Sequence, residues 1–265
     1  MDAGAWWWFF AGMNLPLSPR IRATGAPPIP AVRGWAARYQ GGAGPVLDLT
    51  QAVPGYPPHP DLLARLAAAA GDAEAAGYGP IEGEAALREA LAADMVRAYG
   101  GRLDAADIAI TAGGNLAFTL SMMTLAGSGE AVMLPAPWYF NHRMALEALG
   151  IPCRVLPCRA EDGFLPDPAL AASLMEGVRA IVLVTPNNPT GATYSPELIA
   201  QFAKLCRDRG AWLVLDETYR DFIPEAAGAP HGLFQDAAWR DHVVHLYSFS
   251  KAYCVPGHRI GAIAA

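Results

Sequence analysis

Strand-type and helix-type segments alternate along this chain from about residue 107 onward. Short apolar runs such as DIAIT (107–111) and AIVLVTP (180–186) fit buried strands. Longer segments with helical composition lie between such runs, for example NLAFTLSMMTLAG (115–127) and SPELIAQFAKLCRDRG (195–210). This alternation is typical of βαβ units, whose parallel strands are covered by helices on both faces. We therefore predict an α/β fold with three layers, α/β/α, around a mostly parallel sheet.

The first part of the chain has a different character. Residues 13–60 are rich in Pro and Gly, which exclude long regular elements. We predict an extended N-terminal arm and a portion of a small domain over residues 1–50, with one short helix near Val32 to Tyr39, followed by the large domain over residues 51–265. We interpret residues 1–12 as an upstream mis-start, with Met13 as the true beginning.

Charge and cysteine usage exclude several classes of function. The net charge is −6 and the arginines are scattered singly, so no nucleic-acid partner is expected. The apolar patch from Trp6 to Phe10 is too short to span a membrane and lacks the basic start of a secretory signal. The four cysteines have neither CxxC nor metal-type spacing, which favours free thiols in a reducing compartment. We therefore predict a cytoplasmic protein without a membrane or metal site.

The residues that directly follow the strands are the candidates for a binding site. In open sheets of this kind, ligands bind at the carboxyl ends of the strands. The candidates are Gly113, Gly114, Asn115, Tyr139, Asn188, Asp216, Tyr219, Ser248, Ser250, Lys251 and Arg259.

Several of these candidates have more than one interpretation. Gly113 and Gly114 precede a helix, whose first amides form an anion cradle, but an ordinary glycine turn explains them equally well. Tyr139 fits either core packing or a stacking surface for a ring. Asp216 ends a buried strand, where a carboxylate needs a partner: it either caps the next turn or pairs with a protonated ring nitrogen.

Lys251 is unusual because almost every basic residue of this chain is an arginine. Of 19 basic residues, only Lys204 and Lys251 are lysines. A lysine amine can lose its proton and attack a carbonyl to form a Schiff base, whereas arginine stays protonated. Lys204 lies in the middle of a helical segment, where it fits a solvated surface cation. Lys251 is therefore the candidate nucleophile.

Six motifs in order give these residues a common context: YGPIEG, TAGGN, APWYFNH, NNPTG, DETY and SFSKAYCVPGHRIG. Over residues 45–265 the chain resembles the fold-type I pyridoxal-phosphate (PLP) enzymes, specifically the class I/II aminotransferases related to aspartate aminotransferase. The resemblance implies that the cofactor is pyridoxal 5'-phosphate and that residues 51–265 are its binding domain.

The resemblance also implies a role for each candidate. Lys251 would form the Schiff base with the cofactor aldehyde and then act as acid and base, and Asp216 would keep the pyridine nitrogen protonated. The other roles fall to the remaining candidates: Asn188 and Tyr219 on the phenolic oxygen, Tyr139 on the ring face, and Gly113, Gly114, Asn115, Ser248, Ser250 and Arg259 around the phosphate end. Tyr78 would reach the cofactor of a partner subunit, which implies a homodimer with shared sites.

Two departures from the family pattern stand out. Cys254 occupies a position where the family often has Gly or Ala, and because it is small we expect little effect. The family's C-terminal small domain, with the arginine that binds the substrate carboxylate, has no counterpart here, and we expect it to be absent.

The predicted function is transfer of an amino group from an amino acid to a 2-oxo acid. Two alternatives remain open: a PLP-dependent lyase or synthase on the same scaffold, and a truncated cofactor-binding fragment without turnover. A nicotinamide dehydrogenase is disfavoured because no GxGxxG follows a strand.

Overall fold

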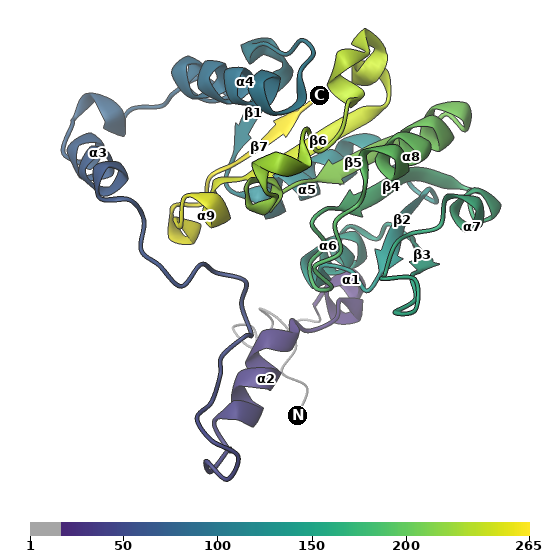
Figure 1. The fold of residues 1–265 in the computed structure, drawn as a ribbon, viewed down its shortest axis with the longest axis horizontal. Coiled ribbons are helices and arrows are strands. Elements are labelled where there is room, and N and C mark those ends of the chain that lie inside the picture. Colours follow the sequence, from purple (N-terminus) through teal and green to yellow (C-terminus); the bar gives the residue numbers. More distant parts are fainter. Residues whose placement is uncertain (1–16) are drawn as a thin grey trace.

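A seven-stranded sheet organises the computed structural model, which describes residues 17–265 (Figure 1). The strand order is β1-β7-β6-β5-β4-β2-β3. The strands are β1 (Ile108–Thr111), β2 (Ala131–Ala136), β3 (Cys153–Pro157), β4 (Val178–Val184), β5 (Trp212–Asp216), β6 (Val243–Ser248) and β7 (Gly261–Ala264). The interpretation of residues 1–12 as a mis-start lies outside the described residues.

Most neighbouring strands are parallel, which confirms the predicted sheet. The pairs β2–β3, β2–β4, β4–β5 and β5–β6 are parallel, whereas β7 is antiparallel to both β1 and β6. Between β6 and β7 the chain has only the short helix α9 (Phe249–Ala252) and the 3₁₀ turn η8 (Pro256–His258). This connection turns the chain back, so β7 enters the sheet in the opposite direction.

Helices cover both faces of the sheet, as predicted. They are α4 (Ala85–Tyr99), α5 (Gly114–Leu125), α6 (Phe140–Leu149), α7 (Pro168–Ser173) and α8 (Pro196–Asp208). Buried side chains of α4, α7 and α8 pack on one face, and those of α5 and α6 pack on the other. The carboxyl ends of the parallel strands therefore stay open between the two helical layers.

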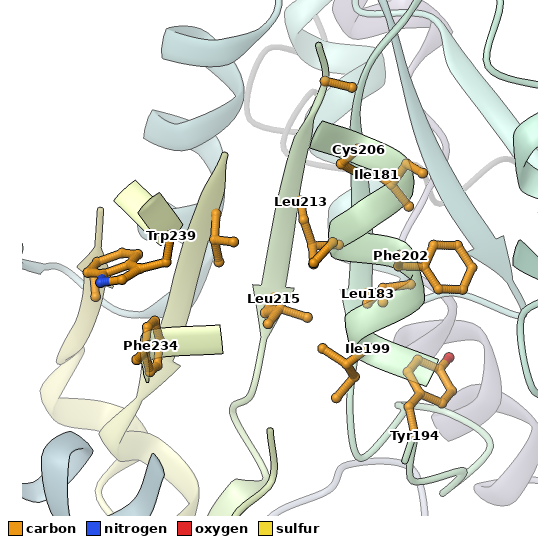
Figure 2. Close-up of a cluster of buried hydrophobic side chains, with 14 of the residues drawn as sticks. Ile181, Leu183, Tyr194, Ile199, Phe202, Cys206, Leu213, Leu215, Phe234 and Trp239 are labelled. Atoms are coloured by element: carbon orange, nitrogen blue, oxygen red, sulfur yellow. The ribbon is translucent and has the colours of Figure 1, made fainter. Parts of the chain in front are cut away.

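The larger part of the core lies under α4, α7 and α8. Figure 2 shows part of this cluster, with these side chains labelled: Ile181, Leu183, Tyr194, Ile199, Phe202, Cys206, Leu213, Leu215, Phe234 and Trp239. Phe202 of α8 is fully buried, and full burial of such a side chain stabilises the fold by about 1.5–3 kcal/mol. This packing makes the sheet a rigid support for the residues at its edge.

The N-terminal arm differs in detail from the prediction. It carries two short helices, α1 (Pro19–Ala23) and α2 (Pro28–Ala36), before α3 (Pro60–Ala70). None of these three helices has a buried residue, and Figure 1 shows α2 standing away from the sheet. The predicted helix near Val32 to Tyr39 was placed too late, because Pro28 occupies the first turn, where a missing amide hydrogen costs nothing.

Within residues 17–265, no helix combines the length and the apolar character that crossing a membrane requires.

Candidate functional site

A pocket lies at the carboxyl ends of β4, β5 and β6. It is lined by Gly114, Asn115, Tyr139, Val184, Asn188, Asp216, Thr218, Tyr219, Ser248, Ser250, Lys251, Pro256 and Arg259. Ten of the residues proposed from the sequence thus meet at one place, although they come from segments far apart in the chain. The parallel strand order explains the convergence, since each strand delivers its following loop to the same edge of the sheet.

One end of the pocket is built for an anion. Gly113 has φ +87°, and a Cβ there would lie 2.2 Å from Nη2 of Arg259, so the guanidinium packs directly over this backbone. A Cβ on Gly261 would lie 2.5 Å from the carbonyl carbon of Gly113, so β7 also needs a glycine at its first position. Ser248 is the N-cap of α9 and accepts a hydrogen bond from the Ser250 amide at 3.3 Å. A guanidinium, a hydroxyl and the start of α5 therefore surround one small volume.

The pocket also contains a buried carboxylate, Asp216. Asp216 lies 3.0 Å from Nε2 of His142 through Oδ2, and its Oδ1 accepts hydrogen bonds from the amide (3.1 Å) and hydroxyl (2.7 Å) of Thr218. Burial raises the pKa of Asp216, but the hydrogen bond and charge of His142, together with Thr218, hold it below its ordinary value. The aspartate is therefore ionised and fixed in position before any ligand binds.

His142 and Thr218 are functional residues that the sequence reasoning did not single out. The His142 ring stacks on Phe118 of α5 with the ring centroids 3.9 Å apart, which holds the imidazole beside Asp216. Both residues lie inside the motifs APWYFNH and DETY. The sequence indicated these two residues only indirectly, because a buried carboxylate such as Asp216 requires charge or hydrogen-bond partners from elsewhere in the chain.

Lys251 extends from α9 into the pocket. Burial lowers the pKa of its amine, and the nearby charge of Arg259 lowers it further. Its Nζ donates a hydrogen bond to the backbone carbonyl of Ala52 at 2.5 Å and lies 5.9 Å from the centre of the Tyr219 ring. The amide of Asn188 donates to the Tyr219 hydroxyl at 3.3 Å, and burial raises the pKa of Tyr219 to about 12. The lowered pKa leaves more of the Lys251 amine in its neutral, nucleophilic form, beside neutral hydrogen-bonding groups.

Tyr139 forms a third side of the pocket at the start of α6. Its hydroxyl accepts a hydrogen bond from the side chain of Asn141 at 2.7 Å and lies 3.4 Å from Oδ1 of Asn115. Its ring meets the His142 ring edge-on, with the centroids 5.1 Å apart. Burial raises the pKa of this hydroxyl, so it stays protonated. Tyr139 therefore packs against the His142 ring and also lines the pocket.

The remaining sequence candidates lie outside the pocket lining. Gly113 is directly behind it, under Arg259. Tyr78 is fully exposed in the loop before α4, and its contact with a partner subunit stays a prediction. Lys204 forms an ion pair with Asp208 on the exposed side of α8, which confirms the surface role expected for the second lysine.

Comparisons with known proteins agree with this arrangement. The sequence profile of the family "Aminotransferase class I and II" matches residues 45–265. An aromatic aminotransferase of Arabidopsis thaliana is 32% identical over 253 residues, covering 94% of this chain and 61% of the relative. A valine–pyruvate aminotransferase of Mycobacterium tuberculosis is 31% identical over 241 residues, covering 89% of this chain and 61% of the relative.

Solved structures give the same result. An aminotransferase from Mycobacterium tuberculosis superposes with a TM-score of 0.81 at 28% identity, over 95% of this chain and 64% of that one. Aspartate aminotransferase from Thermus thermophilus with maleate superposes with a TM-score of 0.79 at 27% identity, over 95% of this chain and 65% of that one. The chain thus spans about three-fifths of the length of the proteins it matches.

Proposed function

Because the chain belongs to the class I and II aminotransferase family, we propose that it carries the cofactor site of an enzyme that moves an amino group from an amino acid to a 2-oxo acid. The observation that carries this proposal is the meeting of Lys251 and Asp216 in one pocket that Arg259 and Ser248 also line. An amine, a buried carboxylate and an anion cradle are the groups that a phosphorylated pyridine aldehyde requires.

Enzymes of this family depend on pyridoxal 5'-phosphate, and the residues of the pocket fit that group. The cradle under Arg259 exists only because Gly113 and Gly261 lack side chains, and it matches a phosphate in charge. Asp216 is an ionised carboxylate suited to a protonated pyridine nitrogen. Ser248, Ser250, Gly114 and Asn115 supply further hydroxyl and amide donors around the anion: these complete the cradle.

The bound cofactor supplies an electron sink for the pair of electrons left when a bond to the substrate α-carbon breaks. The chain's own groups act around it. Lys251 would hold the aldehyde carbon and, once released, would carry a proton at Nζ. Asp216, held in place by His142, would keep the ring nitrogen protonated. Asn188 and Tyr219, which are hydrogen-bonded to each other, would donate to the phenolic oxygen, and Tyr139 would lie against the ring.

We propose further that the protein works as a homodimer in the cytoplasm. The side chains of Leu116, Leu120 and Met123 recur on one face of α5, with exposed fractions of 39%, 40% and 61%. Tyr78 and Ile81 are also fully exposed, in the loop whose Glu82 carbonyl accepts a hydrogen bond from the β1 amide of Ile110. A second copy on this surface would bury the apolar side chains and bring Tyr78 to a neighbouring site. The four cysteines are free, in keeping with a reducing compartment.

We also propose the division into an arm over residues 1–50 and a cofactor-binding domain over residues 51–265. The absence of buried residues in α1 and α2 supports a separate arm.

The experiment that tests the function uses the purified chain and its two lysines. Incubation with PLP, reduction with borohydride and peptide mapping is expected to find the cofactor on Lys251. Lys251→Ala is expected to abolish the adduct, whereas Lys204→Ala, on the exposed side of α8, is expected to leave it unchanged. An adduct that forms equally in Lys251→Ala would refute the site.

A second measurement separates the reactions. Amino acids are added to the loaded protein, and the products are analysed with and without a 2-oxo acid acceptor. A new amino acid formed only with the acceptor supports amino transfer. Release of ammonia and a 2-oxo acid without any acceptor would instead support a lyase.

A further inference from the structure

A second set of ionisable side chains is buried on the other face of the sheet from Asp216. At its centre is Glu217, whose side chain is fully buried. Its Oε2 accepts a hydrogen bond from the Tyr99 hydroxyl at 2.5 Å, and it lies 2.9 Å from Nε2 of His245 and 3.3 Å from Nε2 of His231. We call these four residues the Glu217 cluster. Its members come from α4, β6, the end of β5 and the loop before the 3₁₀ turn η6 (Leu233–Gln235).

Burial opposes the charged forms of the ionisable groups in the Glu217 cluster. Burial raises the pKa of Glu217, but the charge of His231 and the hydrogen bond of His245 bring the pKa below its ordinary value. Burial lowers the pKa of His245, against the pull of Glu217. A buried ionic set of this kind adds little net stability over apolar packing, while removing one member is costly. Its value is therefore in fixing one geometry.

A buried arginine extends the same network to the turn after β5. The Arg220 guanidinium pairs with Asp94 of α4 and lies 4.3 Å from the centre of the Tyr247 ring and 5.5 Å from that of Tyr99. The Tyr247 hydroxyl donates to Asp221 at 2.7 Å. These contacts tie the turn to α4 and to the last residues of β6.

The network touches the same two strand ends that supply the pocket. Asp216 and Glu217 are consecutive, yet Asp216 contacts His142 of α6 and Glu217 contacts Tyr99 of α4, on opposite faces of the sheet. The Glu217 amide also donates to the Leu246 carbonyl of β6 at 3.0 Å. A movement of the Glu217 backbone therefore also moves the peptide bond that joins it to Asp216.

The end of β6 repeats this arrangement. Tyr247 faces Arg220 and Asp221, whereas the next residue, Ser248, lines the pocket. Side chains of successive strand residues point to opposite faces, so a contact that holds Tyr247 also sets the direction of Ser248.

We propose that the Glu217 cluster is a positioning device for the pocket. It clamps the carboxyl ends of β5 and β6 from behind, so that Asp216 and Ser248 are held at fixed positions toward a ligand. Glu217 itself touches no ligand and acts through Asp216. Only the last readout below, cofactor affinity, rests on the proposed function.

The test measures hydrogen exchange at two amides that report on the pocket. The Thr218 amide donates to Asp216 Oδ1 at 3.1 Å, and the Ser250 amide donates to Ser248 Oγ at 3.3 Å. Glu217→Gln replaces the carboxylate with an amide of the same size, and Tyr99→Phe removes one hydroxyl and keeps the ring. Both are expected to speed exchange at the two amides about tenfold relative to the amides of β4, and to weaken PLP binding by a similar factor.

The matched control is Phe202→Leu, which loosens the core on the same face of the sheet, away from the cluster. It is expected to change exchange at all slow amides together and to leave PLP affinity within about twofold. Exchange at Thr218 and Ser250 that stays in step with β4 in both cluster variants would overturn the proposal. Tyr99→Phe, which loses one hydroxyl, decides the matter if Glu217→Gln does not fold.

These outcomes are separable from the failure of the proposed function. If the wild-type chain binds no PLP, the cofactor assignment fails, while the exchange measurement still decides whether the cluster positions Asp216 and Ser248.

Discussion

Lys251 and Asp216 line the same pocket but have different surroundings. The aspartate is buried with a histidine and a threonine as partners, whereas the lysine is half-buried with Arg259 as a like charge. The surroundings of Asp216 stabilise its charged form, whereas those of Lys251 destabilise its charged form. Ionisable groups whose pKa values are shifted by burial and specific partners within one pocket are typical of functional sites.

The lowered pKa of Lys251 predicts an early onset of reactivity with pH. The neutral amine is the nucleophile, so labelling of Lys251 by an acylating reagent is expected to reach its pH midpoint below 10.5, the ordinary lysine value. Between the lowered value and 10.5 the unfolded chain binds more protons, so the stability contributed by this group rises with pH. Peptide mapping after short labelling measures the rate, with Lys204 as the internal reference for reagent loss. A midpoint at or above 10.5 would contradict the assignment.

The backbone at Cys254 is strained, although its small side chain was expected to have little effect. Its φ is +56°, a left-handed conformation that costs residues with a Cβ about 1–2 kcal/mol. The backbone conformation, rather than the available space, is therefore what favours glycine at this position. Cys254→Gly is expected to raise the free energy of unfolding by about 0.5–1 kcal/mol, because part of the gain is lost to unfolded-state entropy.

Denaturant unfolding measures this difference, and Cys254→Ala is the matched control. Alanine keeps the Cβ and hence the strain, so its stability is expected to stay within about 0.5 kcal/mol of the wild-type value. Equal stabilisation by Ala and Gly would show that the sulfur, and not the backbone, is responsible.

At the scale of elements, the regular part of the chain could be predicted and the arm could not. Strands such as β4 are mostly apolar runs, and each parallel strand brings its next loop to one edge, so the residues that follow the strands could be predicted to share one site. The arm has no periodicity, and its helices have no buried side chains from which to infer them. The His142–Asp216 pair and the Glu217 cluster also depend on which helix covers which face, which local patterns do not determine.

The antiparallel strand β7 supports the anion cradle through its first residue. A Cβ on Gly261 would lie 2.5 Å from the Gly113 carbonyl carbon, whereas Gly257, in η8, has open space around its Cβ position. Gly261→Ala is expected to destabilise the fold by about 1–3 kcal/mol, since backbone must move, and to weaken phosphate and PLP binding at least tenfold. Gly257→Ala is expected to change either quantity little. Thermal unfolding and titration with PLP measure both, and unaltered binding in Gly261→Ala would refute the close approach.

At the scale of the whole molecule, the two layers differ in how completely they are covered. The buried side of α5 packs Ala117, Phe118 and Met122 against the sheet, while Leu120 and Met123 remain outside. An apolar stripe on a core helix is typical of a surface that meets another protein. The proposed homodimer would cover this stripe with a second copy of the chain, so the stripe gives that proposal a testable surface.

A charge on this stripe is therefore expected to separate the copies. Met123→Lys places an ammonium on a side chain that is 61% exposed in the single chain, so folding is expected to be unaffected, whereas burial of that charge in an interface is unfavourable. Light scattering at matched concentrations is expected to give a dimer for the wild type and a monomer for the variant. Leu165→Lys, at a side chain 43% exposed in the loop before α7, is the control and is expected to remain dimeric. A wild-type monomer, or a dimer that survives Met123→Lys, would rule out this face of α5 as the interface.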